Sequence, residues 1–358
     1  MFARKRLNRG LSPCLTAGTE QGEIQNVEKE SLVKSVPPLD QTPLCLRELA
    51  VADCDEMRAL FEKVFKQPLS ALLWHWKYAD GRGIGLGAFI EEKLIGHYGG
   101  LAREILYKGQ KKTAIQIVDV MVDSRAHGSL KRKGPFFSLA TNFFERYSGY
   151  DKPYLLAYGF PNLRHRKISY GFGLHKEVDI FSELVWPAVD KASGLRNKLQ
   201  KLDLASSGDR CLADRLWEQM AGDLANEIVG CRDAGYLQHR YLNHPERDYQ
   251  LFVVTTRFTR QPVGLFVVRV EDETLLLLDV VCPLRNIAPM VYHARRQAYA
   301  MGLKSLKAWI SSSHSRYFPE AEARETDIHI SAQMHSPGPS IDQLQGQWWA
   351  TPGDTDFK

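Results

Sequence analysis

The spacing of apolar residues along the chain predicts alternating strands and helices. Residues 115–122 form an apolar run rich in β-branched side chains, which is typical of a buried strand. Residues 135–148 repeat apolar side chains at intervals of three and four, which predicts an amphipathic helix beginning at Pro135. Its apolar stripe consists of Phe136, Leu139, Ala140, Phe143, Phe144 and Tyr147. We expect a strand over 153–160 and a short helix over 162–170 after it.

The second half of the chain repeats this order of elements. Its pattern predicts helices over 212–224 and 287–301, and strands over 249–255, 263–270, 275–281 and 306–310. The Trp-Lys-Tyr at 76–78 aligns with the His-Arg-Tyr at 239–241, and Asp119 aligns with Asp279. From tyrosine to aspartate the spacing is 41 positions in the first half and 38 in the second. We infer an internal duplication.

The duplication divides the chain into two predicted domains. A length of 358 residues is enough for two domains of ordinary size and a tail. Residues 1–42 are polar and lack hydrophobic periodicity, so we expect a disordered N-terminal segment. The domains are predicted to span 43–187 and 207–358, with a linker over 188–206.

Composition excludes several classes of protein. The net charge of +5 is spread over short clusters, whereas nucleic-acid binders usually carry a basic patch or stripe. No run of 18 apolar residues is present, so we expect no membrane span, and the N-terminus has no apolar stretch typical of a signal peptide. The six cysteines form no CxxC pair, which fits a cytoplasmic protein without a zinc ribbon or disulfide framework.

The strand, loop and helix over 115–148 carry the clearest chemical signal. A helix N-terminus offers free N–H groups and a partial positive charge, and a preceding glycine lets a phosphate approach the backbone. Here Gly134 precedes the helix, and Lys131, Arg132 and Lys133 precede Gly134. This segment is therefore either a pyrophosphate site or an ordinary turn with solvated lysines.

The residues Lys-Arg-Lys-Gly-Pro-Phe at 131–136 resemble a known motif. They are similar to the basic-x-x-Gly-x-small motif of the GNAT superfamily of acyl-CoA N-acyltransferases, whose main-chain N–H groups bind the CoA pyrophosphate. The Trp-His-Trp-Lys-Tyr at 74–78, the Gly-Phe-Pro-Asn at 159–162 and the Gly-Leu at 173–174 resemble the bacterial subgroup with duplicated domains. The resemblance covers residues 44–187, and 207–358 resemble a degenerate copy.

This resemblance implies a fold and an activity. The fold would be α/β, a mixed α+β sheet in two tandem GNAT-like domains. The activity would be metal-free transfer of an acetyl group from acetyl-CoA to an amine, with the second domain shaping the acceptor site. Small amines, aminosugars and protein lysines all remain open as acceptors, and the oligomeric state is not indicated.

The resemblance also implies roles for individual residues. Cofactor contacts are expected from Val120, Val122, Lys131, Arg132, Lys133, Gly134, Pro135, Phe136, Asn162 and Arg166. Asp119 or Asp123 is the candidate base, and Tyr170 is the candidate acid. Alternatively, Asp119 is structural like Asp279, Asn162 caps a helix, and Arg166 lies on a solvated helix face.

Three departures from the family pattern keep alternatives open. Phe136 occupies a motif position that is usually small, Gly128 offers a second partial match to the motif, and Ser169 stands where a tyrosine is common. A catalytically inactive binding protein and an aminoacyl transferase are therefore alternatives to the acetyltransferase.

The Asp-Thr-Asp at 354–356 resembles a DxD motif near the end of the chain. Two adjacent tryptophans, Trp348 and Trp349, precede it and suggest that this segment packs against the body. We expect packing or capping for these aspartates first, a substrate-facing carboxylate second and a metal site third.

Overall fold

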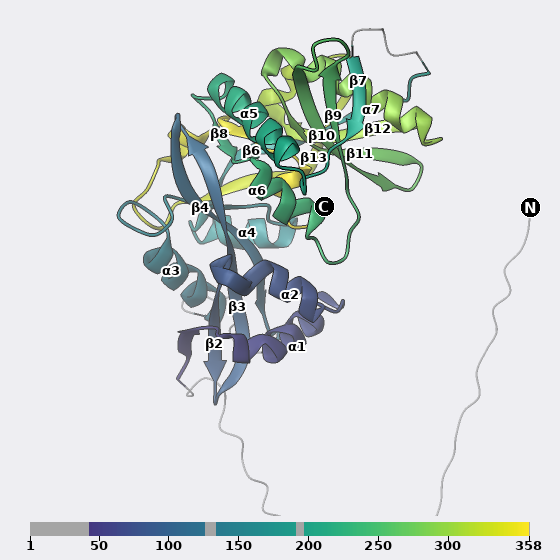
Figure 1. Ribbon diagram of the computed structural model, residues 1–358. Coiled ribbons are helices and arrows are strands. Elements are labelled where there is room, and N and C mark those ends of the chain that lie inside the picture. Colours follow the sequence, from purple (N-terminus) through teal and green to yellow (C-terminus); the bar gives the residue numbers. More distant parts are fainter. Residues whose placement is uncertain (1–42, 126–133, 191–196, 358) are drawn as a thin grey trace, which may run out of the picture. The chain divides into compact units, whose positions relative to one another are not determined.

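A long mixed β-sheet passes through both halves of the chain (Figure 1). The computed structural model describes residues 43–125, 134–190 and 197–357. The predicted N-terminal segment over 1–42 lies outside the described residues, as do Gly128 and the basic cluster Lys131, Arg132 and Lys133.

The first half supplies the elements that build one GNAT-like unit. In order they are β1 (Cys45–Glu48), α1 (Cys54–Phe65), α2 (Ala71–Tyr78), β2 (Gly83–Ile90), β3 (Lys93–Tyr107), β4 (Gln110–Val122), α3 (Pro135–Tyr147), β5 (Ala157–Gly159), α4 (Leu163–Gly171) and β6 (His175–Pro187). The helix predicted from Pro135 is confirmed as α3, and its apolar stripe packs on the sheet with Tyr98 and Ile115. The strand predicted over 153–160 is shorter, because only β5 pairs with neighbouring strands.

The second half repeats the arrangement. Its elements are β7 (Asn197–Lys201), α5 (Ser207–Asp223), β8 (Ile228–Gly230), α6 (Ala234–Leu237), the π-helix η3 (Gln238–Leu242), β9 (Gln250–Thr256), β10 (Pro262–Glu271), β11 (Thr274–Val281), η4 (Leu284–Asn286), α7 (Ile287–Ala300), β12 (Ser305–Ser311), β13 (Glu322–Gln333), α8 (Ile341–Leu344), β14 (Trp348–Trp349) and η6 (Pro352–Asp354). In both halves three antiparallel strands precede a helix and a parallel strand, β2-β3-β4-α3-β5 and β9-β10-β11-α7-β12. This repeat confirms the predicted fold of two tandem units.

The predicted linker needs a correction. Five of the residues over 188–206 form the edge strand β7, which pairs with β9. Leu199 is its one apolar side chain and the other four are polar, so the strand has no alternating apolar pattern that could be recognised in the sequence.

The two halves exchange strands across the middle of the sheet. The strand order is β4-β5-β13-β6-β12-β11, so β13 from the second half lies beside β5, and β6 from the first half lies beside β12. Trp186 of β6 is fully buried in the core of the second half, where its indole N–H donates to the Pro319 carbonyl at 2.9 Å. The aligned motifs also meet, because Trp76 stacks on His239 with ring centroids 5.0 Å apart. The halves therefore share one continuous structure.

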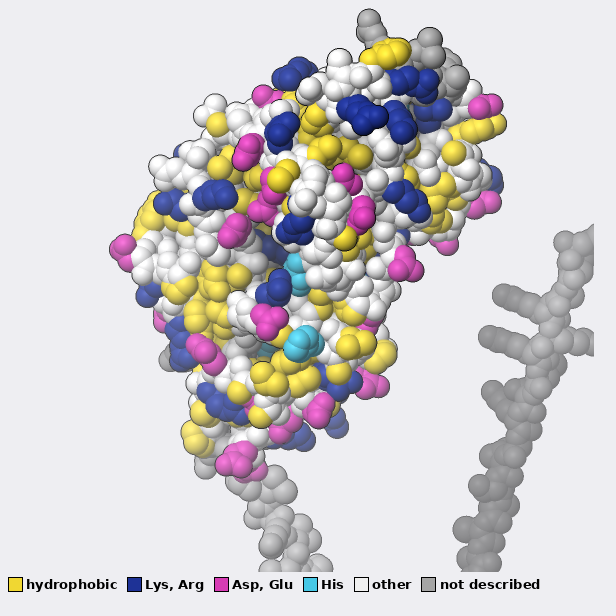
Figure 2. Space-filling view, in the orientation of Figure 1, with side chains coloured by type: hydrophobic (Ala, Val, Ile, Leu, Met, Phe, Trp, Pro, Cys, Tyr) yellow, Lys and Arg dark blue, Asp and Glu magenta, His cyan; other side chains and the backbone are white. Residues whose placement is uncertain are grey.

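Three general findings concern the environment of the protein. No helix among the described residues has the length and apolarity needed to cross a bilayer. On the face shown in Figure 2, lysine and arginine side chains are interspersed with acidic ones. Cys45, Cys54, Cys211, Cys231 and Cys282 are free thiols.

Candidate active site

A cleft opens where β4 and β5 separate. The two strands pair only from Ile115 to Ile117 on β4, after which β5 ends and β4 continues to Val122. On its other edge β4 bulges against β3, and Asp119 adopts a left-handed conformation with φ 50°. A bulge bends and twists its strand. The β5-facing edge of residues 118–122 is thus left without a strand partner, in keeping with the expectation that Val120 and Val122 face a ligand.

Three adjoining cavities line this cleft. The central cavity, about 140 Å³, is bordered by Asp119, Val120, Gly159, Asn162 and His175. The α3-side cavity, about 550 Å³, is bordered by Val120, Val122, Asp123, Phe136, Asn162 and Arg164. The α1-side cavity, about 780 Å³, is bordered by Phe61, Leu73, Lys77, Asp119, Asn162, Arg166, Arg247 and Asp356. Asn162 borders all three, so they form one groove across the end of β5.

The start of α3 lies beside this groove. Gly134 is the N-cap residue and Pro135 the first helical residue, and no side chain in the described part of the chain caps the helix. Phe136 is buried and contacts His165 edge-on, with ring centroids 5.5 Å apart. The free N–H groups of this helix start are therefore not taken up by a capping side chain.

Asn162 and its neighbours on α4 have separable roles. The Asn162 side chain accepts a hydrogen bond from the His165 N–H at 2.9 Å, which is the N-cap interaction expected as one of its two roles. The asparagine also borders the groove, as the other role requires. Arg164 borders the α3-side cavity, whereas Arg166, predicted to contact the cofactor, borders the α1-side cavity.

Asp119 is held as a buried anion. Its carboxylate accepts hydrogen bonds from the Lys77 ammonium at 2.9 and 3.1 Å and from the Tyr78 hydroxyl at 2.7 Å. Burial alone would raise the pKa of Asp119, but the Lys77 charge and these hydrogen bonds outweigh it and lower the pKa. Because a base works best with a pKa near the working pH, this setting favours the structural role for Asp119.

Asp123 and Tyr170 are also engaged. Asp123 forms an ion pair with Lys63 and accepts the Arg125 N–H at 3.1 Å; these partners outweigh the effect of burial and lower its pKa. The Tyr170 hydroxyl lies 2.7 Å from the Ser331 hydroxyl, and Ser331 borders the central cavity. Burial raises the pKa of Tyr170. Tyr170 thus connects to the cleft through Ser331, a residue that sequence analysis did not single out.

Comparison with known families bears on the identity of this cleft. Residues 46–174 match the family described as "Acetyltransferase (GNAT) domain". This match places residues 46–174 in the GNAT superfamily. No curated protein gives a significant sequence match. The family match supports acyl-CoA-dependent acyl transfer as the class of activity.

Several solved structures share the fold of this GNAT protein. A probable N-acyltransferase from Enterococcus faecalis is 14% identical with a TM-score of 0.64, covering 81% of this chain and 72% of that one. A GCN5-related N-acetyltransferase from Kribbella flavida is 15% identical with a TM-score of 0.61, covering 81% and 71%. The N-myristoyltransferase of Saccharomyces cerevisiae, solved with myristoyl-CoA, is 10% identical with a TM-score of 0.52, covering 93% and 92%.

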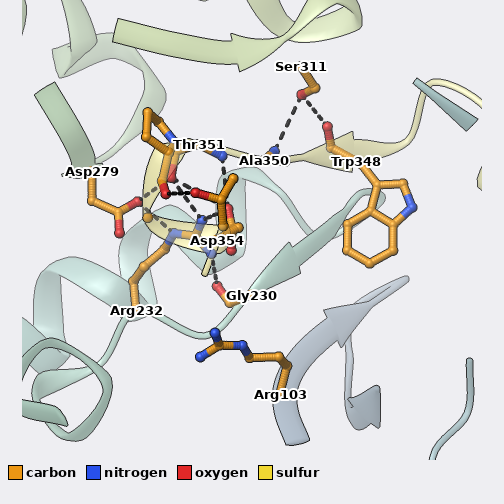
Figure 3. Close-up of polar contacts among 12 residues, drawn as sticks. Arg103, Gly230, Arg232, Asp279, Ser311, Trp348, Ala350, Thr351 and Asp354 are labelled. Carbon is orange, nitrogen blue, oxygen red and sulfur yellow. Dashed lines mark hydrogen bonds and ion pairs between the residues drawn. The ribbon is translucent and has the colours of Figure 1, made fainter. Parts of the chain in front are cut away.

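The second half of this GNAT protein repeats the aspartate but not the open cleft. Tyr241 donates to Asp279 just as Tyr78 donates to Asp119, so the aligned spacings reflect the same hydrogen bond. Between β11 and β12, however, the C-terminal segment 350–355 occupies the space (Figure 3). A Cβ atom on Gly353 would lie 2.4 Å from the Asp279 carboxylate, which shows how closely this segment packs.

A buried arginine anchors that segment. Arg232 is fully buried and lies between Asp279, at 3.1 Å, and Asp354, with which it forms a second ion pair (Figure 3). Asp354 also accepts the Thr351 N–H at 2.8 Å, so packing and capping, the first expectation for this residue, is confirmed. No described group of three His, Cys, Asp or Glu side chains is arranged to hold a metal ion.

The segment then continues into the first half. Asp356 lies 3.2 Å from the Lys77 ammonium and borders both the central and the α1-side cavities. Burial alone would lower the pKa of Lys77, but Asp119 and Asp356 raise it. Asp356 therefore borders the cleft, as the second role expected for this motif, a substrate-facing carboxylate, would require.

Two histidines beside the central cavity predict acid sensitivity. Burial lowers the pKa of His165 to about 4 and, together with the nearby His165, lowers that of His175 to about 3. A histidine whose pKa is depressed on folding stabilises the fold fully above pH 6.5, and this contribution is lost as the pH falls. Between pH 7 and 5 we expect His175 alone to reduce the unfolding free energy by about 2 kcal/mol.

Replacing His175 by phenylalanine tests this expectation. The ring lies edge-on to Phe144 at 5.2 Å, and its Nδ1 atom has no hydrogen-bond partner among the described residues, so an apolar ring should be tolerated. Urea unfolding gives the free energy of unfolding at pH 7 and at pH 5. The decrease in this free energy from pH 7 to pH 5 should be smaller by about 2 kcal/mol in His175→Phe than in the wild type. The exposed His75, changed to phenylalanine, is the control and should leave the difference unaltered. An unchanged difference in His175→Phe would contradict the expectation.

Proposed function

We propose that this protein transfers an acetyl group from acetyl-CoA to an amine that attacks the thioester directly. The observation that carries the proposal is the open groove beside the unpaired edge of residues 118–122, next to the uncapped start of α3. N–H groups at a helix start bind phosphate groups, and Lys131, Arg132 and Lys133 precede this helix in sequence. The pyrophosphate of acetyl-CoA would lie there, with Phe136 and Asn162 as walls.

The remainder of the carrier would follow β4 to the central cavity. Backbone N–H groups of residues 120–122 would bind the pantetheine arm and polarise the thioester carbonyl, as donors aimed at a developing oxyanion do. The central cavity of about 140 Å³ suits an acetyl group better than a long fatty acyl chain. Tyr170, acting through Ser331, is our candidate for the protonation of the leaving thiolate.

The amine would enter from the α1-side cavity. Asp119 is fully engaged by Lys77 and Tyr78, and 5% of its side chain is exposed, against 19% for Asp356. Asp356 is thus the carboxylate that an incoming ammonium group can reach. Attack requires a neutral amine, so we assign Asp356 the role of accepting its proton, directly or through water.

The test combines binding with turnover. Acetyl-CoA should stabilise the protein by RT ln(1 + [L]/Kd), about 2.7 kcal/mol at a hundredfold excess over Kd, whereas adenosine alone should not. Release of CoA thiol should then depend on an added amine and should be faster with acetyl-CoA than with myristoyl-CoA. Stabilisation without thiol release for any amine would favour the alternative of a binding protein. If acetyl-CoA neither stabilises the protein nor releases thiol, the proposed function is wrong.

A further inference from the structure

Two arginines in the α1-side cavity have no part in the chemistry proposed above. Arg166 comes from α4, and Arg247 comes from the connection between η3 and β9. Each has an Nη1 atom shielded from solvent without a hydrogen-bond partner among the described residues. Arginine stays charged in proteins, and leaving a buried charged donor unpaired is unfavourable. Both side chains border the cavity, and neither forms an ion pair with a carboxylate among the described residues, so the cavity offers two unpaired cations to an anionic ligand.

Four acidic side chains border the same cavity, Asp119, Glu246, Asp327 and Asp356, and three of them are engaged by other residues, Asp119 by Lys77 and Tyr78. Glu246 accepts a hydrogen bond from the Ser70 hydroxyl, and Asp356 pairs with Lys77 where the cavity joins the central one. Arg247 holds the Phe357 carbonyl at 3.0 Å through its other terminal nitrogen, which fixes the guanidinium beside the C-terminal segment. The cavity thus offers a carboxylate at its junction with the cleft and unpaired guanidinium donors on its walls.

Apolar side chains form the remaining wall of the cavity. Phe61 and Leu73 come from α1 and α2, Leu163 from α4 and Ile328 from β13. An apolar wall with a few placed polar groups is the usual make-up of a small-molecule site. Planar guanidinium groups match carboxylates through paired hydrogen bonds. The geometry points to a ligand that carries an amine, a carboxylate and an apolar side chain.

We propose that the α1-side cavity binds an acceptor amine bearing a carboxylate, of the α-amino-acid type, through Arg166 and Arg247. This inference rests on the proposed acetyl transfer and names its substrate class. The ammonium end meets Asp356, the carboxylate meets the two guanidinium groups, and the side chain lies on the apolar wall. The assignment places Arg166 at the acceptor in place of the cofactor.

A matched set of amines tests the assignment. Phenylalanine, phenylalaninamide and phenethylamine share a ring and an amine, and they differ at the carboxylate. We expect kcat/KM for phenylalanine to exceed that for each of the others at least tenfold. Amidation makes the amine less basic, which by itself favours attack by the amide, so a preference for the acid reports recognition of the carboxylate. Phosphoethanolamine is included as an amine with a different anion.

Variants then locate the recognition. Arg166→Gln and Arg247→Gln should each raise KM for phenylalanine about tenfold, the loss expected for about 1.4 kcal/mol of binding. The ratio of kcat/KM for phenylalanine to kcat/KM for phenethylamine should fall by about the same factor, because phenethylamine has no carboxylate to lose. Arg285→Gln, which removes an exposed arginine of η4, is the matched control and should have no effect. Thermal unfolding of each variant without ligand verifies that it is folded.

The outcomes separate this inference from the proposed function. Equal use of all three aromatic amines would overturn the inference and leave acetyl transfer intact. Preference for phosphoethanolamine would overturn the carboxylate assignment. If no amine releases thiol, the proposed function is wrong, and binding in the α1-side cavity is then tested by thermal shift with phenylalanine in the presence of CoA. A shift of the wild-type unfolding temperature that is lost in both arginine variants would support the binding site. Absence of a shift in the wild type would overturn it.

Discussion

Replacing Arg232 by methionine is expected to lower the free energy of unfolding by about 3–5 kcal/mol. The side chain is fully buried and pairs with Asp279 and Asp354, and it also donates to the Gly230 carbonyl. Methionine would fill much of the volume but would leave two carboxylates in the interior without their cation. Burial already raises the pKa of Asp354 despite the arginine, so the site depends on that charge. Equilibrium urea unfolding measures the loss.

Two further variants make this measurement specific. Lys304→Met breaks an exposed ion pair with Glu273, which should cost no more than about 1 kcal/mol. Adding Asp279→Asn and Asp354→Asn to Arg232→Met removes the uncompensated charges and should recover part of the stability, since replacing a whole buried ion cluster is far less harmful than breaking it. A loss below about 1 kcal/mol for Arg232→Met would show that the buried cluster does not support the fold.

Changing Gly134 to aspartate is expected to abolish binding of acetyl-CoA. Gly134 has φ −76° and ψ 171°, an extended conformation that aspartate adopts readily, and it occupies the N-cap position of α3. An aspartate there would accept the free N–H groups itself, because this residue is a preferred N-cap. It would also place a negative charge where the pyrophosphate is proposed to lie. The helix should therefore be stabilised while the anion site is lost.

Thermal shift in the presence of acetyl-CoA checks this prediction. The stabilisation of about 2.7 kcal/mol at a hundredfold excess over the wild-type Kd should disappear. Gly208→Asp provides a control, since Gly208 is an exposed residue in the first turn of α5, where a Cβ atom would make an ordinary contact with the Ser206 hydroxyl at 3.6 Å. Wild-type affinity for acetyl-CoA in Gly134→Asp would show that the phosphate site lies at Gly128 or outside this loop.

Local signals explain which parts of the structure could be predicted. The start of α3 at Pro135 followed from apolar spacing and proline chemistry, both properties of neighbouring residues. Comparison of the two halves also placed Tyr78 and Tyr241 in equivalent positions, which the shared hydrogen bonds to Asp119 and Asp279 explain.

Contacts between distant residues could not be predicted in the same way. β13 begins with exposed polar residues, and the short alternation at Ile328, Ile330 and Ala332 does not indicate which strands it pairs with, yet it lies beside β5 at the centre of the sheet. Asp356 meets Lys77 across 279 positions, and Arg232 meets Asp354 across 122. Such pairs depend on the assembled fold, so the sequence pointed to the proposed carrier side of the groove and missed most of its proposed acceptor side.

The C-terminal segment makes the two repeats interdependent. In the second repeat, the space between β11 and β12 is filled by the C-terminal segment 350–355. The same segment is followed directly by Asp356, which contacts Lys77 of the first repeat. Since β6 and β13 are also exchanged, neither repeat would be complete if it were expressed alone. A substitution that disrupts the second repeat is therefore expected to disturb the cleft of the first repeat as well.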